Sequence, residues 1–150
     1  MTKLHKNGHE GVARWSKSVD LFECAYILVP VHLGNHWTLL VVDNTRDTVS
    51  YYDGLGGRHE PYMSLLLEYL YTEAEAKKKP MKPYKPCYPR APRQQNGYDC
   101  GVFVLVYALC ILRGHEMTFT QSDMPYFRRR IAYELLTNKP LFVYSCMVYI

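Results

Sequence analysis

The strongest constraint on how this chain folds is an uninterrupted apolar segment, CGVFVLVYALCIL, from Cys100 to Leu112. On a helix, this segment carries apolar side chains on every face, so the helix has to be buried. The run from Val102 to Leu112 is shorter than the roughly 18 to 20 residues that a membrane-spanning helix needs. We therefore expect a helix in the middle of a globular domain, with Gly114 as its stop.

The composition indicates a single compact domain over residues 1–150. Hydrophobic residues make up 48% of the chain, which is enough to build a core at this length. The five cysteines are odd in number, show no C-x-x-C spacing and follow no secretory signal. We therefore expect free thiols in a reducing compartment. The net charge of +4 is too small to indicate nucleic-acid binding.

Three short apolar, β-branched runs precede the buried helix. They span Ala25 to His32, Trp37 to Val42 and Thr48 to Tyr52, and turn residues separate them. This spacing predicts an antiparallel meander. The second run barely alternates between apolar and polar residues, so we expect it to be central and covered on both faces.

The remaining segments differ in composition and in predicted structure. The first twenty residues are polar, and we expect them to be poorly anchored. Apolar residues at helical spacing predict an amphipathic helix from Pro61 to about Lys78. The following stretch, KKKPMKPYKPCYPRAPR, contains five prolines and permits only extended or edge-strand geometry.

The basic stretch and the last helix complete the organisation. Seven positive charges and no acid lie between Glu75 and Asp99, and we favour a solvated basic loop over a nuclear import signal or a substrate-steering patch. A last helix is expected after residues 120–123, with Pro125 in its first turn. Its inward-facing residues would be Phe127, Ile131, Leu135 and Leu136.

Three residues with catalytic chemistry fall at the ends of these elements. His36 lies at the start of the second strand, Asp53 at the end of the third, and Cys100 at the start of the buried helix. A cysteine at a helix N-terminus beside an imidazolium is favoured as the thiolate, which is the nucleophile. We expect Asp53 to accept a hydrogen bond from the imidazole Nδ1–H, which leaves Nε2 facing the sulfur.

Donors for an oxyanion are also available near the helix start. The side-chain amide of Gln94 and the backbone N–H of Cys100 can both supply one. Other residues compete for these roles: Gln95 for Gln94, His32 for His36, and Asp43 and Asp99 for Asp53. We expect Asp99 to cap the buried helix or its turn, and the other four cysteines to be structural.

At this point the sequence resembles a known family, the ubiquitin-like-protein-specific (SUMO/sentrin-specific) cysteine proteases. The resemblance rests on the strings Asn35-His36-Trp37, Tyr52-Asp53 and Gln94-Gln95-Asn96-Gly97-Tyr98-Asp99-Cys100-Gly101, and it runs from about Gly8 to Leu141. It implies an α+β, papain-like fold in which a central helix carries the cysteine against a mainly antiparallel sheet that carries the histidine and the aspartate.

The resemblance also implies an activity and a set of roles. The protein would be a thiol-dependent peptidase and isopeptidase that cleaves after the C-terminal Gly-Gly of a SUMO-like modifier, in deconjugation or precursor processing. Cys100 would be the nucleophile, His36 the general base and acid, Asp53 its orienter and Gln94 the oxyanion donor, six residues before the cysteine. Trp37 would cover the channel that admits the Gly-Gly tail, because only glycine lacks a Cβ. No cofactor or metal is implied.

The sequence departs from the family pattern at both ends. Family catalytic domains begin with a helical region that contains a Trp-Leu-Asn-Asp motif, and no such string occurs here. We therefore expect an N-terminally truncated catalytic domain with an incomplete channel and impaired activity. A catalytically silent modifier-binding domain is the alternative, and a protease for another modifier or for peptides is a third. Residues 141–150 form an apolar tail, which is either an added strand or an aggregation-prone segment.

The expected setting follows from the same resemblance. The partners would be a SUMO-like modifier and its conjugates, with no nucleic acid and no membrane. We expect a monomer located in the nucleus, with the cytoplasm as the alternative.

Overall fold

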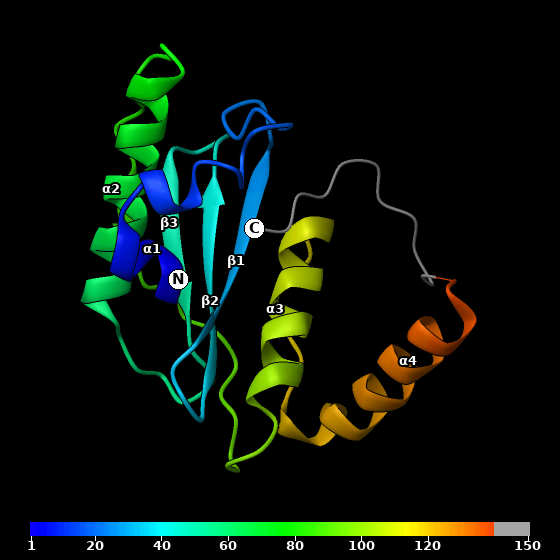
Figure 1. Cartoon of the computed structure of the whole chain (residues 1–150). Coiled ribbons are helices and arrows are strands. Elements are labelled where there is room, and N and C mark those ends of the chain that lie inside the picture. Colours follow the sequence, from blue (N-terminus) through cyan, green and yellow to red (C-terminus); the bar gives the residue numbers. More distant parts are fainter. Residues whose placement is uncertain (140–150) are drawn as a thin grey trace.

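The computed structural model describes residues 1–139 as a four-stranded sheet with helices on both faces (Figure 1). The elements follow the order α1 (Thr2–Asn7), the 3-10 helix η1 (Glu10–Val12), β1 (Tyr26–His32), β2 (Trp37–Asp43), β3 (Thr48–Tyr52), α2 (Glu60–Ala76), β4 (Lys85–Cys87), α3 (Cys100–Arg113), the 3-10 helix η2 (Gln121–Asp123) and α4 (Met124–Thr137). The expected apolar tail, 141–150, lies outside the described residues.

The sheet has the strand order β1-β2-β3-β4. The first three strands form the predicted antiparallel meander, and β4 pairs with β3 in parallel after the α2 crossover. All of β2 except Trp37 is buried, which confirms its central place. The proline-rich stretch contributes the short edge strand β4, where Pro86 costs no interior ladder bond.

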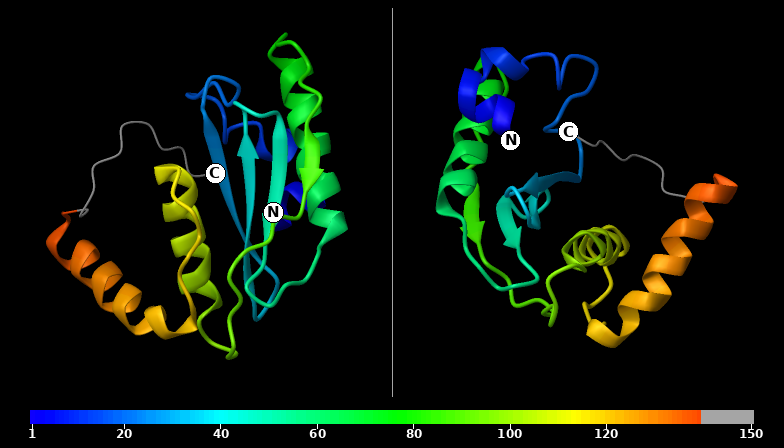
Figure 2. Two further views of the ribbon diagram at one scale, coloured as in Figure 1. Left: turned by 180° about the vertical axis from the view of Figure 1, so that it is seen from behind. Right: turned by 60° about the horizontal axis from the view of Figure 1, so that its bottom comes forward.

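The two faces of the sheet carry two cores. Helices α1 and α2 cover one face, and α3 covers the other with α4 beyond it (Figure 2). Alternation along β1 divides the side chains: Ile27 and Val29 belong to the α2 side, and Leu28 belongs to the α3 side. The sheet is therefore the middle layer. It places the start of β2 and the end of β3 next to the start of α3.

Helix α3 is central but is not buried on every face. Phe103 and Tyr107 are fully buried against the sheet, whereas Leu105 is 50% exposed. The helix ends at Gly114 in the left-handed conformation, as expected for a glycine stop. The apolar composition of α3 thus exceeds what the sheet and α4 cover.

The expectation of a poorly anchored N-terminal segment is wrong. Leu4 and Val12 are buried in the core on the α2 side. Glu73 of α2, which is 2% exposed, accepts hydrogen bonds from Ser16 Oγ at 2.5 Å and contacts His9 Nε2 at 2.5 Å. A buried carboxylate needs such donors, so the segment that supplies them is fixed to α2.

The inward face predicted for α4 is half correct. Phe127 and Ile131 pack against the α3 core. Leu135 and Leu136 are 78% and 87% exposed, which contradicts the prediction. Figure 1 shows the reason, since α4 starts beside α3 and then diverges from it, so its later turns have no described element to pack against.

No described helix, between residues 1 and 139, is both long enough and apolar enough to span a membrane.

Candidate active site

The His36 ring and the Asp53 carboxylate meet at the end of the sheet. The β1–β2 turn is closed by a hydrogen bond from Leu33 N to His36 O at 2.8 Å, which places His36 just before β2. Asp53 follows β3 directly, and its Oδ1 lies 2.6 Å from His36 Nε2. Both side chains are largely buried, at 14% and 7% exposure. The strand ends therefore form the pair that the sequence indicated.

The two ring nitrogens of His36 have exchanged the roles that the sequence predicted. Asp53 contacts Nε2, so Nδ1 is the nitrogen left for another partner. The reason is reach: Nε2 is the distal nitrogen and extends across to the neighbouring strand, while Nδ1 stays near its own backbone. The pair still fixes the ring orientation, because one nitrogen is held by a carboxylate.

The loop after β3 holds Asp53 in place. Leu55 N donates to Asp53 Oδ1 at 2.8 Å, and Gly57 N donates to Oδ2 at 3.0 Å. Gly56 between them has a φ of 76°, a conformation that favours glycine. Asp53 is thus oriented by backbone donors as well as by the imidazole.

Cys100 lies at the first position of α3 and is 8% exposed. It lines a groove of about 490 Å³ together with Trp37 and Gly101. The indole of Trp37 lies against the helix start, since a Cβ at Gly101 would be 3.9 Å from Trp37 Cδ1. Trp37, 40% exposed, therefore borders the groove that contains the thiol.

The competing histidine, His32, has a packing role. Its ring lies 4.5 Å from the indole of Trp37, measured between centroids. The competing aspartate Asp43 accepts from Thr45 N and Thr45 Oγ1 in the β2–β3 turn, away from this pair. Neither residue is brought to the His36 and Asp53 pair.

Gln94 is buried beside the Asp53 loop, whereas Gln95 is exposed. Gln94 N donates to Gly54 O at 2.9 Å, and its Nε2 donates to Asn96 O at 2.6 Å. A Cβ at Gly54 would lie 2.7 Å from Gln94 Oε1, so the close approach requires glycine there. One of the two amide hydrogens of Gln94 is used by Asn96, and the other remains for a ligand.

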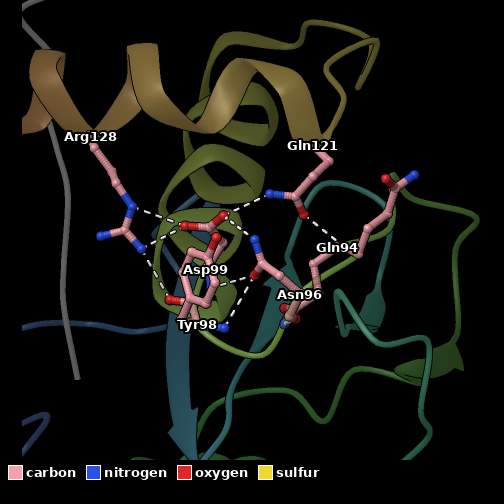
Figure 3. Close-up of polar contacts among 7 residues, drawn as sticks. Gln94, Asn96, Tyr98, Asp99, Gln121 and Arg128 are labelled. Atoms are coloured by element: carbon pink, nitrogen blue, oxygen red, sulfur yellow. Dashed lines mark hydrogen bonds and ion pairs between the residues drawn. The ribbon is translucent and has the colours of Figure 1, made fainter.

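The carboxylate of Asp99 makes contacts that the sequence did not reveal (Figure 3). Asp99 occupies the N-cap position of α3. Of its two expected roles, capping the helix or capping its turn, the second is found, because the carboxylate binds Asn96 of the turn and makes no cap hydrogen bond to the helix. It accepts instead from Asn96 Nδ2 and Gln121 Nε2, both at 2.7 Å, and from Arg128 Nε and Nη2 at 2.9 and 2.6 Å. An aspartate directly before a proposed nucleophile is the sequence signal that could have prompted a search for an arginine or lysine partner later in the chain.

Burial opposes ionisation of Asp99, but hydrogen bonds from Asn96, Arg128 and Gln121 outweigh it and lower the pKa of its carboxyl below the ordinary value. Asp99 is therefore a carboxylate at neutral pH and carries a full negative charge one residue before Cys100.

A second, larger cavity of about 890 Å³ borders Asp53 and is lined by three arginines, Arg58, Arg90 and Arg93. Lysines of the same basic stretch are engaged elsewhere, with Lys79 Nζ 2.5 Å from Asp20 Oδ2. The stretch is therefore only partly the free, solvated loop that the sequence indicated.

Among residues 1–139, no group of three or more His, Cys, Asp or Glu side chains could hold a metal ion.

Comparisons with known proteins agree with this geometry. The model of the Ulp1 protease family, C-terminal catalytic domain, matches residues 1–139. Human Sentrin-specific protease 2 is 38% identical over 150 residues, covering 93% of this chain and 25% of that protein. The chain therefore spans about a quarter of this relative.

Two solved structures share the fold. The C-terminal Ulp1 protease domain in complex with Smt3, the yeast ortholog of SUMO, superposes with a TM-score of 0.81 at 29% identity, covering 91% of this chain and 64% of that one. Ulp1 with its catalytic cysteine oxidised to a sulfonic acid gives a TM-score of 0.81 at 29% identity, with 91% and 65% covered. These neighbours confirm the predicted papain-like α+β fold.

Proposed function

This chain belongs to the Ulp1 protease family, and on that premise we propose that it is a cysteine peptidase and isopeptidase that cleaves after the C-terminal Gly-Gly of a SUMO-like modifier. The observation that carries the proposal is the paired His36 and Asp53 at the end of the sheet, beside a groove that contains both Cys100 and Trp37. The relative solved with the yeast SUMO ortholog supports the choice of modifier.

The proposed first step is acylation. The Cys100 thiolate attacks the terminal glycine carbonyl, and a C–S bond forms while the carbonyl electrons move onto oxygen. The Gln94 amide and the Cys100 backbone N–H stabilise this oxyanion. When the oxyanion collapses, the C–N bond breaks and the imidazolium of His36 gives its proton to the leaving amine.

The second step is hydrolysis of the thioester. His36, now neutral, takes a proton from water, and the hydroxide adds to the acyl carbon. Collapse breaks the C–S bond, returns the thiolate beside the imidazolium and releases the modifier as a carboxylic acid, which gives its proton to solvent. Asp53 accepts the hydrogen bond from Nε2–H in both steps.

Trp37 supplies the proposed specificity. Its indole borders the groove at the start of α3, so a peptide that reaches Cys100 must pass beside a flat ring. Glycine fits where a Cβ would collide with the ring or with the groove floor. A Gly-Gly end is the chemical class that such a passage admits.

The cellular compartment and the oligomeric state are also proposed. Cys87, Cys100 and Cys110 form no disulfide within the part of the chain that the structure describes, which supports a reducing compartment, the nucleus or the cytoplasm. The lysine run at 77–79 is a weaker support for the nucleus, because Lys77 and Lys79 bind Glu73 and Asp20. We propose a monomer that acts on the modifier and its conjugates.

Covalent labelling tests the proposal. A SUMO-like modifier with a C-terminal electrophile in place of the last carboxylate should label the protein once, and Cys100→Ser should abolish the labelling. Cys87→Ser, at a half-buried thiol on β4, is the matched control and should label normally. Labelling that survives Cys100→Ser contradicts the nucleophile, and binding of the modifier with no turnover of a Gly-Gly-ended fluorogenic substrate contradicts the enzyme.

A further inference from the structure

We propose that Asp99 and Arg128 act as a positioning pair for the proposed nucleophile: Asp99 fixes the turn that carries both oxyanion donors, and Arg128 neutralises the charge of Asp99 beside Cys100. The inference rests on the proposed function. Neither residue contacts the Gly-Gly tail in this mechanism, so both act through Gln94 and Cys100.

The first argument is the connection from Asp99 to Gln94. Asn96 donates from Nδ2 to the Asp99 carboxylate at 2.7 Å, while its own Oδ1 accepts from Asp99 N at 3.1 Å. The carbonyl of Asn96 then accepts the Gln94 amide at 2.6 Å. The Gln94 amide is thus held by a residue that Asp99 holds from both its side chain and its backbone.

Gln121 of η2 closes the same turn from the other side (Figure 3). Its Nε2 donates to Asp99 at 2.7 Å, and its Oε1 accepts from Gln95 N at 2.8 Å. The two ends of the segment from Gln94 to Cys100 are therefore joined through one carboxylate. Removing that carboxylate frees the backbone that presents both proposed donors.

The second argument concerns charge. Asp99 is 3% exposed and adjoins Cys100, so an unpaired carboxylate there would be costly and would oppose a second negative charge on the sulfur. Arg128 forms a two-nitrogen contact with Asp99 Oδ1 and also donates from Nη2 to Tyr98 O at 3.0 Å. The pair is neutral as a unit, which permits an acid at this position.

Two described residues that can carry charge line the groove with Cys100: Tyr98 of the same turn and Arg128 of α4. The His36–Asp53 pair lies at the end of the sheet, where His36 directly precedes Trp37. Arg128 is the cation from α4, and it lines the same groove as Cys100. We therefore expect the loss of Arg128 to disfavour the thiolate of Cys100. When Asp99 is lost as well, the thiolate should be favoured as in the wild type.

The test compares Asp99→Asn, Arg128→Met and the double variant, with Arg129→Met as the matched control because Arg129 is an exposed arginine on the same helix. Two readouts separate the two roles. Hydrolysis of the Gly-Gly-ended fluorogenic substrate needs the oxyanion donors. Alkylation of Cys100 by iodoacetamide needs the thiolate but no oxyanion donor.

Asp99→Asn should lower kcat about 10- to 100-fold with a change in KM of less than about 3-fold, because donors that act in the transition state are misplaced. Its alkylation at neutral pH should be undiminished. Arg128→Met should lower kcat similarly and move the half-maximal pH of alkylation upward by about 0.5 to 1 unit, a modest shift because Arg128 is partly exposed. The double variant should keep the low kcat and return the alkylation profile to that of the wild type.

Several outcomes contradict the pair. An unchanged alkylation profile in Arg128→Met, or a shift that persists in the double variant, removes the charge role and indicates a packing effect. An unchanged kcat in Asp99→Asn removes the positioning role. If Arg128→Met does not fold, Arg128→Lys keeps the charge without the two-nitrogen contact and should show a normal alkylation profile with reduced kcat. A wild-type protein that alkylates normally but does not turn over contradicts the proposed function instead.

Discussion

At the residue scale, the arrangement of His36 depends on which of its nitrogens each neighbour uses. Nε2 contacts the Asp53 carboxylate, so in the proposed mechanism Nδ1 is the nitrogen that serves the sulfur. The backbone donors to Asp53 from Leu55 and Gly57 keep that carboxylate in one rotamer. The imidazole that we propose as the general base is therefore already oriented in the protein without a substrate.

This orientation predicts the effect of Asp53→Asn. An asparagine has one acceptor oxygen for donors that lie on both sides of the Asp53 carboxylate. If that oxygen accepts from Gly57 N, the NH2 group faces Nε2 and favours the other tautomer, so kcat for a Gly-Gly-ended substrate should fall about 10³- to 10⁴-fold. Steady-state kinetics measure the loss, and circular dichroism verifies the fold. Asp43→Asn, in the β2–β3 turn, is the control and should retain activity. Equal losses in both variants would assign the effect to the sheet.

Trp37 is expected to act on selectivity. Trp37→Ala removes the ring that borders the groove, so substrates that end in Ala-Gly or Gly-Ala should gain relative to Gly-Gly by about 10-fold or more in kcat/KM. Competition between paired substrates measures the ratio. His32→Ala removes the ring that lies tilted against the indole but keeps the indole itself, and it should change the ratio less. An unchanged ratio in Trp37→Ala would exclude steric selection by the ring.

Sequence reasoning proposed His36, Asp53 and Cys100 because each falls at the end of an element, and it proposed Gln94 because of the family resemblance. It could not assign the nitrogens of His36, since these depend on a side-chain rotamer. It also missed Arg128, which lies 29 residues after Asp99 and becomes its partner only when α4 starts beside α3. Contacts made across separate elements leave no periodic signal in the chain.

At the element scale, the segment before β1 is attached to α2 through Glu73. Burial raises the pKa of Glu73, but hydrogen bonds from Ser16, His9 and Lys77 outweigh it, so the pKa lies below the ordinary value. A carboxyl with a lowered folded-state pKa contributes stability above the unfolded pKa, and this stability is lost as the pH falls through the folded pKa.

Glu73→Gln should therefore lower the free energy of unfolding by about 2 kcal/mol at pH 7, because the amide cannot satisfy three donors. The difference from the wild type should shrink as the pH falls below the ordinary carboxyl range and through the lowered pKa of native Glu73, because the native carboxyl is then protonated as well. Urea unfolding at several pH values measures both effects. Glu68→Gln, at an exposed position of the same helix, should change little. A difference that is constant with pH would contradict the ionic account.

The divergence of α4 from α3 makes a second expectation. Phe127→Ala removes a ring that packs on Phe119, with the centroids 6.2 Å apart, and should cost about 1–2 kcal/mol of stability. Leu136→Ala, at an 87% exposed position, should cost less than about 0.5 kcal/mol. Thermal unfolding distinguishes them. Comparable losses would mean that the end of α4 packs closely in solution.

The apolar spacing predicted α2 and α4 correctly, but it made the buried face of α4 too long. Leu135 and Leu136 continue the helical spacing of Phe127 and Ile131, and spacing alone cannot show where a neighbouring helix stops. The N-terminal segment failed in the opposite sense. Its polar composition suggested weak attachment, but Ser16 and His9 both bind the buried carboxylate of Glu73.

At the scale of the whole molecule, the layers differ in how well they are covered. The sheet has a core on each face, whereas α4 lies outside α3 and has only one buried residue, Met124. Composition and the apolar run predicted the central layer. They predicted an inward face for α4, of which Phe127 and Ile131 pack against the α3 core. They could not predict the Asp99–Arg128 contact that also joins α4 to the start of α3.

Amide hydrogen exchange should reflect these layers. The amides of β2 and of the buried face of α3 should exchange most slowly, near the rate of global unfolding. Those in the second half of α4 should exchange at least about 100-fold faster, because their opening exposes little apolar surface. Exchange followed by NMR gives the residue-level comparison. Equal protection along α3 and α4 would contradict the layered distribution.

The parallel pairing of β3 with β4 has a further consequence for how the protein matures. The β1–β3 meander closes through short turns, but β4 joins only after the chain has passed through α2, and α3 follows it. Closing such distant segments is slow compared with forming local hairpins. In the proposed mechanism, Cys100 therefore joins the His36–Asp53 pair late, after β4 has paired with β3 and α3 has formed. The proposed peptidase activity then arises only when α3 packs on the finished sheet, and the earlier meander alone does not carry it.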